Sequence, residues 1–263
     1  LQGYDLDAIV DGELIWGLIS LPDSGLAHIT DADLGTFTYH PFPNYNGIDI
    51  LGFSVSDYSQ HADSTLTFIN VLPVNDAPVI KPNVSADLGF LANSSVLATT
   101  GNEGHAISSI LSTQTLGSDV DIPHYLNLYN HMGVAITYVQ NDGTHKWKYC
   151  LNCEESSTYL TTDNWITIDS AAVNSGNALL LGPTDRLAFD GHGITVDTTF
   201  NFEFQLWDMT GGNSSGSYAD ASESGGSTAF STGFLSGSQQ IVRACVLNIP
   251  DIPFPFSRCN IHL

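Results

Sequence analysis

The sequence predicts an all-β protein made of two consecutive β-sandwich domains, of which the first is incomplete at its N-terminus. The main observation is a two-residue alternation of apolar and polar side chains, the pattern of half-buried strands. It occurs over residues 36–39, 51–56, 65–71, 134–139 and 200–207. Clusters of Gly, Asn, Asp and Pro separate these segments, as turns do in sandwiches. We find no convincing amphipathic helix, and 263 residues are enough for roughly two domains.

Composition narrows the function. A hydrophobic content of 42% supports a packed core. The chain contains 6 Lys and Arg residues in total and 28 Asp and Glu residues, which gives a net charge of −22. Nucleic acid and anionic membranes are therefore excluded as partners, because both bind basic surfaces. Most of the acids are Asp, a residue of turns and a ligand of hard cations. They form either a solvated acidic surface or loop carboxylates gathered around Ca²⁺.

Three separated pieces of the first half fit one design. Residues 35–41 read GTFTYHP, residues 44–57 read NYNGIDILGFSVSD, and residues 74–78 read VNDAP. They resemble the cadherin-like and Ig-like tandem repeats of large extracellular adhesins. The resemblance implies a cell-surface or matrix β-sandwich with calcium at its joints, and not an enzyme.

The second half resembles a longer repeat of the same class, the VCBS-type repeat of adhesins and cell-surface filament glycoproteins. The matching pieces are DVD at 119–121, GVAIT at 133–137, WITI at 165–168, LLLGPTDRLAF at 179–189 and FQLWDMTGG at 204–212. The hairpin after Trp147 departs from this pattern, because CLNCEE at 150–155 replaces a short Gly/Asp-rich turn.

The expected domains follow from these patterns. A cadherin-like repeat without its first strands covers residues 1–77, and a longer repeat covers 78–248. The second repeat contains a flexible Gly/Ser-rich loop at 211–238 before a last strand at 240–247, and residues 249–263 form a Pro-rich tail or linker. The strands missing from the first repeat have either been cut away from a longer polypeptide or are supplied by another chain.

The candidate metal ligands are acidic and amide side chains near the repeat ends. Two D-x-D pairs stand out, because residues i and i+2 of an extended loop point to the same side. Ca²⁺ takes six to eight oxygen ligands. The resemblance implies a joint site at Asn75, Asp76, Asp119, Asp121 and Asp208, and a half-site at Asp5, Asp7 and Asp57. The alternative is that the Asn-Asp-Ala-Pro joint is a rigid turn without metal.

Four cysteines and three sequons indicate an oxidising, extracellular compartment. We favour two local disulfides, Cys150–Cys153 and Cys245–Cys259, over a Cys₄ zinc site or cross-pairing. The Asn-x-Ser sequons predict glycosylation in loop-like segments at Asn83, Asn93 and Asn213.

Together these features predict a non-catalytic structural or adhesive segment of a large extracellular glycoprotein, acting as a spacer or filament-building module. No P-loop or dinucleotide-binding glycine motif is present. The expected partners are neighbouring repeats, other copies and other cell-surface glycoproteins, with no membrane insertion by this segment. The alternative is a lectin-like module that binds glycans through an exposed Trp and the loop 211–238, although the four Trp have the pattern of core residues.

Overall fold

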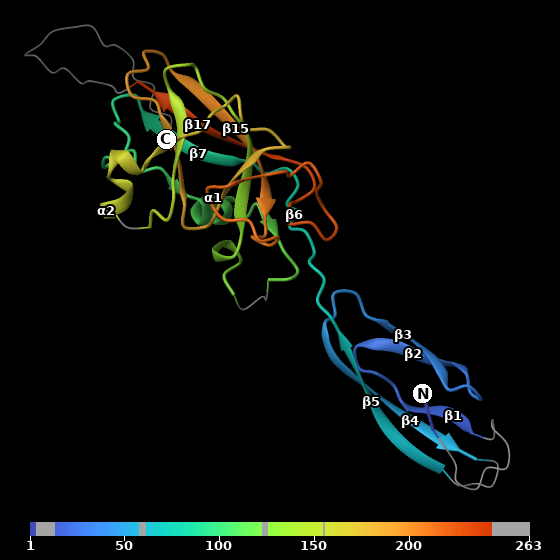
Figure 1. Ribbon diagram of the computed structural model, residues 1–263. Coiled ribbons are helices and arrows are strands. Elements are labelled where there is room, and N and C mark those ends of the chain that lie inside the picture. Colours follow the sequence, from blue (N-terminus) through green and yellow to red (C-terminus); the bar gives the residue numbers. More distant parts are fainter. Residues whose placement is uncertain (4–13, 58–61, 123–125, 155, 244–263) are drawn as a thin grey trace, which may run out of the picture. The chain divides into compact units, whose positions relative to one another are not determined.

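The computed structural model describes residues 1–3, 14–57, 62–122, 126–154 and 156–243. The chain divides into two compact units, unit 1 (Leu1–Val74) and unit 2 (Asn75–Leu263), each considered by itself below (Figure 1). Both units consist mainly of strands, so the predicted all-β fold class is confirmed. Within the described ranges, no helix has the length and apolar character needed to cross a membrane.

The described residues of unit 1 form a small sandwich of five strands. A three-stranded sheet of order β1-β4-β5 is accompanied by the hairpin β2–β3. The strands are β1 (Ile15–Ser20), β2 (Gly25–Asp31), β3 (Thr36–Pro41), β4 (Gly47–Ser56) and β5 (Ala62–Val71). Leu51 and Phe53 on β4 are fully buried and two residues apart, as the predicted alternation requires, and Trp16 on β1 is buried as well. The ring of Phe37 on β3 lies 4.9 Å from that of Phe53, so the hairpin packs on the sheet.

Unit 2 is larger, and its described residues form two principal sheets. One has the strand order β16-β13-β10-β15-β17-β7, the other the order β12-β11-β14-β8, and β6 pairs with β9. The strands are β6 (Val79–Ile80), β7 (Ala86–Ala92), β8 (His105–Ala106), β9 (Gly117–Ser118), β10 (Gly133–Val139), β11 (Lys146–Cys150), β12 (Ile166–Thr167), β13 (Ala178–Leu181), β14 (Arg186–Asp190), β15 (Thr198–Trp207), β16 (Tyr218–Ala219) and β17 (Leu235–Val242).

Aromatic side chains join the two sheets of unit 2. The ring of Trp147 on β11 lies 4.8 Å from that of Phe202 on β15. Phe189 on β14 stacks on Phe200 of β15 at 4.0 Å. Each pair brings together residues of opposite sheets, and such pairs stabilise beyond the apolar area they bury. Because side chains alternate along β15, Phe200 and Phe202 lie on the same face of this strand and both contact the opposite sheet.

Helices were not expected, and this expectation is wrong. Unit 2 contains α1 (Ile107–Gln114), the short α2 (Ser156–Tyr159) and two 3₁₀ turns, η1 (Leu128–Asn130) and η2 (Thr162–Asn164). Helix α1 buries Ile107, Ile110 and Leu111, which share one face at helical spacing. Such a short helix owes its stability to this packing, because two helical turns alone are marginal in water.

The Gly/Ser-rich region also differs from its prediction. Residues 211–238 contain β16, which pairs with β13, and the buried apolar side chains of Ala221, Phe230 and Leu235. The last described strand, β17, starts at Leu235 and not at residue 240. A few apolar residues thus anchor a segment whose composition indicates a flexible loop. The Pro-rich tail 249–263 lies outside the described residues.

Candidate metal centre

The candidate site lies where three segments of unit 2 meet. Asn75 and Asp76 come before β6, and Asp119 and Asp121 come after β9. Because β6 and β9 pair antiparallel, the residues that precede β6 run beside the residues that follow β9. Asp208 comes directly after β15 and supplies the third segment.

Gly117 on β9 makes this meeting possible. A Cβ atom at this position would collide with the side chain of Leu206 on β15 and with the carbonyl oxygen of Val79 on β6. Only a residue without a side chain therefore lets β9 lie against both neighbouring strands. The two following aspartates are carried into the site by this close packing.

Hydrogen bonds connect the segment before β6, called the linker below, to the loop after β9 and to the loop after β15. Nδ2 of Asn75 donates to Oδ2 of Asp208 at 2.7 Å. The backbone N–H of Asp76 donates to Oδ2 of Asp121 at 2.6 Å, and the N–H of Asp121 donates to Oδ1 of Asp119 at 2.8 Å. The structure thus brings together all five residues of the joint site expected from the sequence.

Among the five residues of the candidate site, Asp119 is the one whose carboxylate lacks a hydrogen-bond partner on a buried oxygen. It is only 9% exposed, and its Oδ2 atom is buried without a hydrogen-bond partner. Burial raises the pKa of this carboxyl, and the negative charges of Asp208, Asp121 and Asp76 raise it further. A buried carboxylate that faces other carboxylates is costly, and protonation or a cation would remove that cost.

A cavity of about 400 Å³ opens beside the cluster. Its lining combines three carboxylates with apolar side chains and with other polar side chains. The lining residues are Asn75, Asp119, Asp121, Ile122, Leu126, Asn130, His131, Asp208, Met209 and Thr210.

The donor chemistry of this cluster suits a hard cation, since carboxylate oxygens are the ligands that Ca²⁺ prefers. The present arrangement is held by hydrogen bonds. Oδ1 of Asp208, for example, accepts from the backbone N–H and the hydroxyl of Thr210 at 2.8 and 2.6 Å. Among the residues that the structure describes, no three His, Cys, Asp or Glu side chains are grouped so as to hold a metal ion. The structure therefore places the expected ligands together and does not converge them on one point.

The expected half-site belongs to unit 1. Asp57 directly follows β4, just as Asp208 directly follows β15 in unit 2. Asp5 and Asp7 lie outside the described residues, so this half-site stays a prediction.

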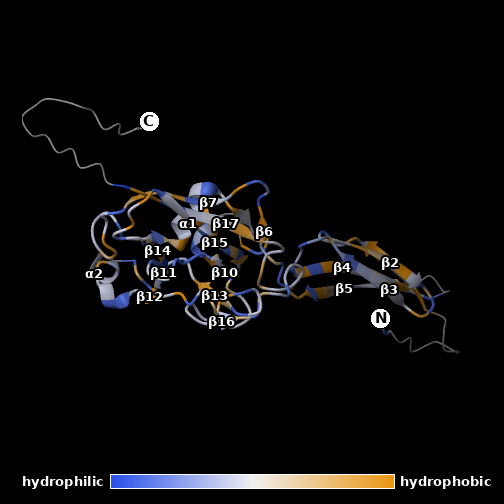
Figure 2. Cartoon of the chain, turned by 90° about the horizontal axis from the view of Figure 1, so that it is seen from above, coloured by the Kyte–Doolittle hydropathy of each residue, from blue (hydrophilic) through white to orange (hydrophobic). Residues whose placement is uncertain are grey.

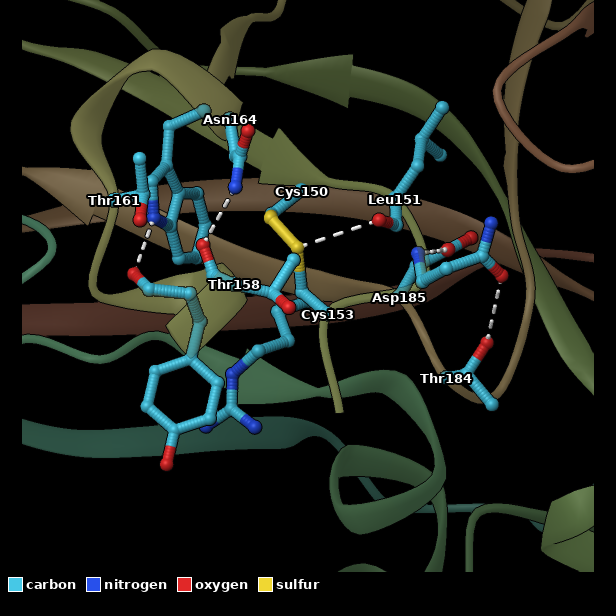
Figure 3. Close-up of a disulfide and its surroundings, with 12 residues drawn as sticks. Cys150, Leu151, Cys153, Thr158, Thr161, Asn164, Thr184 and Asp185 are labelled. Atoms are coloured by element: carbon cyan, nitrogen blue, oxygen red, sulfur yellow. Dashed lines mark hydrogen bonds between the residues drawn. A yellow bond between two sulfur atoms is a disulfide. The ribbon is translucent and has the colours of Figure 1, made fainter. Parts of the chain in front are cut away.

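One of the two expected disulfides joins Cys150, at the end of β11, to Cys153 (Figure 3). Both residues are buried, in a small cluster with Trp165 and Ala188. The indole N–H of Trp165 donates to the carbonyl of Tyr159 at 2.8 Å, which ties the following loop to the bridge. The disulfide leaves neither sulfur free as a thiolate, which disfavours the zinc alternative. Cys245 and Cys259 lie outside the described residues.

Two buried aspartates were not assigned a role from the sequence. The carboxylate of Asp185 accepts hydrogen bonds from the N–H groups of Gly182 and Asn152, at 2.6 and 2.8 Å, and from the hydroxyl of Ser215. It holds together three loops of unit 2. Its position in the TDR segment, just before β14, was the available signal, since Asp in turns commonly accepts backbone N–H groups.

Asp49 has the corresponding role in unit 1. It accepts from the hydroxyl of Tyr39 at 2.9 Å and from the backbone N–H groups of Asp23, Ser24 and Ile50 at 3.0 Å each. Burial alone would raise the pKa of Asp49, but these hydrogen bonds lower it overall. Burial and the hydrogen bond to Asp49 raise the pKa of Tyr39 to about 12.

The tryptophans do not form a glycan-binding platform. Trp147 and Trp207 are fully buried, and Trp16 and Trp165 are 7% and 6% exposed. The lectin-like alternative required an exposed Trp, so it loses the side chain on which it depended. The core assignment of the four tryptophans agrees with their burial.

One short segment of unit 2 matches the letters of a catalytic motif but not its structural setting. Residues 212–216 read GNSSG and match the letters of the Gly-x-Ser-x-Gly nucleophile elbow. That elbow connects a strand to a helix, whereas the element that follows here is the strand β16. The match is therefore compositional and does not identify a nucleophile.

The three sequons differ in exposure. Asn83 is exposed in a turn, and Asn213 is exposed directly after one. Asn93 is half-buried, and its Nδ2 atom, the glycan acceptor, donates to the carbonyl of Ile194 at 2.6 Å.

No protein-family model and no curated protein matches this sequence. Among solved structures, the chain is similar to cadherin ectodomain repeats, the class that its sequence resembles. Mouse cadherin-23 EC22-24 is 9% identical with a TM-score of 0.46, over 90% of this chain and 56% of that one. Human protocadherin-24 EC1-2 is 13% identical with a TM-score of 0.46, over 88% and 82% of the two chains. Human mucin-like protocadherin EC1-2 is 12% identical with a TM-score of 0.45, over 92% of each chain. At these identities and TM-scores, the likenesses carry no argument about the site or the function.

Proposed function

We propose that this chain is a non-catalytic adhesive and structural segment of a large extracellular glycoprotein, in which Ca²⁺ stiffens the link between the two sandwiches. The observation that carries this proposal is the buried, unpartnered Oδ2 of Asp119 among three further carboxylates. Carboxylates on loops that lie side by side repel one another, and a divalent cation turns this repulsion into attraction. The order of the VCBS-type motifs supports the spacer or filament-building role.

In this proposal Asp119, Asp121 and Asp208 provide carboxylate oxygens, and Asn75 and Asp76 provide oxygens from the linker. Bound Ca²⁺ supplies positive charge and oxygen coordination. The residues of the chain set its location, because the linker already donates hydrogen bonds to Asp208 and Asp121. Fastening the linker to two loops of unit 2 removes its freedom to rotate. Asp5, Asp7 and Asp57 are proposed as the equivalent ligands of unit 1.

The extracellular setting rests on the chemistry of the chain. A buried disulfide in unit 2 and the sequons suit an oxidising secretory compartment. We assign the glycans to Asn83 and Asn213, because the amide of Asn93 is engaged within the fold. A net charge of −22 also suits a solvated surface that interacts with neighbouring repeats, other copies and other surface glycoproteins.

Calorimetry of the full chain with and without Ca²⁺ tests the metal centre. At a Ca²⁺ concentration 100 times the Kd, unit 2 should gain about 2.7 kcal/mol of stability. For a unit of this size, that corresponds to a rise in Tm of roughly 5–10 °C. The variant Asp119→Asn/Asp121→Asn should lose the rise, because it removes two carboxylates while keeping their size.

The matched control is Asp31→Asn/Asp33→Asn. These residues have the same D-x-D spacing, and the N–H of Asp33 donates to Asp31 as that of Asp121 does to Asp119. Unlike Asp119, however, both are exposed. The control should keep the full Ca²⁺ response. If wild type and both variants respond equally to Ca²⁺, the ion binds elsewhere or not at all, and the Asn-Asp-Ala-Pro segment is a plain turn.

A further inference from the structure

A further cavity of unit 2, of about 390 Å³, lies beside the turn at 182–185 that connects β13 to β14. The start of α1, the end of η1 and the segment at 153–154 form its other walls. Figure 2 shows α1 close to β14, the strand that begins directly after this turn. The cavity differs from the one beside the carboxylate cluster, although Asn130 borders both.

Backbone hydrogen bonds fix the walls of this cavity. The N–H of Ser108, in the first turn of α1, donates to the carbonyl of Pro183 at 3.2 Å. On the other side of the turn, the N–H of Cys153 donates to the carbonyl of Thr184 at 3.1 Å, and Figure 3 shows both of these residues beside the disulfide. The walls are therefore in place before a ligand arrives, which lowers the entropic cost of binding.

Arg186 is the cationic residue of the lining. Its Nε and Nη2 atoms donate to the carbonyls of Glu103 and Gly104 at 2.9 and 3.0 Å, and its guanidinium lies 4.3 Å from the centre of the Tyr159 ring. These contacts orient the side chain and use two of the five N–H groups of a guanidinium. The residues that the structure describes supply no acceptor for the remaining three.

Arg186 also lacks a counter-ion. Two other cations of unit 2 have one, since Lys148 pairs with Asp190 at 2.9 Å and Arg243 pairs with Asp197 at 3.3 Å. Within the described ranges, Arg186 forms no such pair. Partial burial lowers the pKa of Arg186 because it disfavours the charged form, and a bound anion would offset this cost.

The charge balance of the lining favours an anion with a single charge. Arg186 is accompanied in the lining by one exposed carboxylate, Glu154, and the chain as a whole has a net charge of −22. Inorganic phosphate or sulfate, with about two negative charges each, would meet too little positive charge here. A carboxylate has one negative charge, and its two oxygens fit the fork of the guanidinium N–H groups.

Neutral polar groups complete the lining. The hydroxyl of Ser108 and the side-chain amide of Asn130 have no hydrogen-bond partner among the described residues. The hydroxyl of Thr184 has only a long contact, of 3.4 Å, with the side chain of Asn152. Such groups suit a ligand that carries hydroxyls of its own. A volume of about 390 Å³ lies in the lower part of the range of small-molecule sites and accommodates one substituted sugar ring.

We propose that this cavity binds an acidic sugar, with the carboxylate of the sugar on Arg186 and its hydroxyls on Ser108, Asn130 and Thr184. The site would let the chain bind glycans of other surface glycoproteins. This inference goes beyond the proposed Ca²⁺ centre and uses none of the five residues assigned to it. It also needs no exposed tryptophan, because an arginine provides the specific contact.

NMR titration of the full chain in Ca²⁺-free buffer tests the ligand class. The probes are methyl β-glucuronide and the methyl glycoside of N-acetylneuraminic acid, and at least one of them should bind with a Kd of about 1 mM or below. Methyl β-glucoside has the sugar ring without the carboxylate, and acetate has the carboxylate without the ring. Each of these two compounds should bind at least about tenfold more weakly.

A further compound, the methylamide of N-acetylaspartate, represents an acidic peptide. It should bind as weakly as acetate, because it lacks the hydroxyls that Ser108, Asn130 and Thr184 would recognise. If it binds as tightly as the better of the two sugar acids, the cavity recognises carboxylates in general and the assignment to a sugar is wrong.

Paired variants test the two charged residues of the lining. Arg186→Lys keeps the charge and removes the fork, so it should weaken sugar-acid binding at least about tenfold. Its matched control, Arg243→Lys, changes an arginine outside the lining and should alter the Kd by less than about twofold. Glu154→Gln removes the like charge and should strengthen binding about twofold. Glu223→Gln removes an exposed acid elsewhere in unit 2 and should leave the Kd unchanged.

Arg186 also contacts the segment at 103–104, so far-UV circular dichroism checks the fold of R186K. If R186K does not fold, Ser108→Ala carries the test, because loss of one hydroxyl should weaken binding about threefold and leave the fold intact. The proposal is overturned if wild type binds neither sugar acid, or if wild type and the variants at 108, 154 and 186 bind equally. The Ca²⁺ response of unit 2 should be the same in wild type and S108A, so failure of this proposal leaves the Ca²⁺ centre untouched.

Discussion

Unit 1 and unit 2 each contain a long antiparallel strand pair, yet they surround it differently. In unit 2 the strand β17 of the pair β15–β17 also pairs with β7, and a core with Trp147, Phe189 and Phe202 connects two sheets. In unit 1 the described core around Leu51 and Phe53 is smaller, and Asp49 holds the hairpin β2–β3 to the sheet by hydrogen bonds. Alternation of apolar and polar residues therefore predicts a strand, but it does not predict whether another strand pairs with the edge of that strand. It also implies that unit 1 depends on fewer side chains.

The largest expected effect is the loss of one core aromatic. Phe53→Ala should cost about 3–5 kcal/mol, which is comparable to the whole stability of a small domain. Unit 1 should therefore unfold at 25 °C. The matched variant Trp147→Ala has a similar cost in unit 2, whose larger core should keep it folded. Hydrogen exchange with mass spectrometry would locate each loss, and reduced protection of β10 or β15 in F53A would contradict the expectation that this loss is confined to unit 1.

Removal of the disulfide should have the next largest effect. Cys150→Ser/Cys153→Ser should destabilise unit 2 by about 2 kcal/mol, the value expected for closing a very short loop. Calorimetry should show a lower Tm for unit 2 and an unchanged transition for unit 1. Reductant should lower the Tm of unit 2 more in wild type than in the double variant. An equal loss in both units would show that the bridge acts on more than its own loop.

A smaller effect of opposite sign is expected at Asp119. In the presence of a chelator, Asp119→Asn should stabilise unit 2 by on the order of 1 kcal/mol, because it removes a buried charge among like charges. Chemical denaturation measures this gain. The control is Asp87→Asn in the same unit, at an exposed acid that accepts the N–H of Gly89 and should be neutral. A destabilised D119N would mean that the carboxylate serves the fold even without a cation.

The last expected effect is a pH dependence that appears only away from neutral pH, and it concerns Asp49. The folded state lowers the pKa of Asp49, so its stabilisation is complete above the unfolded value of about 4 and disappears as the pH falls through the folded value. Tyr39 acts in the other direction: its stabilisation is complete below pH about 10 and disappears as the pH rises through about 12. Unit 1 should thus lose stability at both extremes. Asp49→Asn should flatten the acid side of the pH profile of its Tm, and an unchanged profile would remove Asp49 from this role.

Much of the fold could be predicted from local patterns. The alternating segments became β3, β4, β5, β10 and β15, because a half-buried strand must alternate. Helix α1 was missed because eight residues carry too little periodicity to be distinguished from a strand. The ordered part of the Gly/Ser region was missed because two apolar residues, Ala221 and Phe230, anchor it through tertiary contacts.

The residues of the candidate site could be predicted from the sequence, but the burial and hydrogen bonding of their side chains could not. The resemblance named Asn75, Asp76, Asp119, Asp121 and Asp208, and the antiparallel pair β6–β9 brings the linker to the aspartates. Which carboxylate is buried without a partner depends on packing far along the chain, for example on how closely Gly117 lets Leu206 approach. The roles of Asp49 and Asp185 depend in the same way on loops that only the fold brings together.

The parallel pairing of β7 and β17 has a mechanical consequence. These strands lie close to the first and the last described residues of unit 2, and they run side by side in the same direction. A pulling force that enters through residue 75 and leaves beyond Val242 would slide one strand lengthwise past the other. Their hydrogen bonds would then be strained in shear and break together instead of opening one at a time. Unit 2 is in this respect built to resist tension.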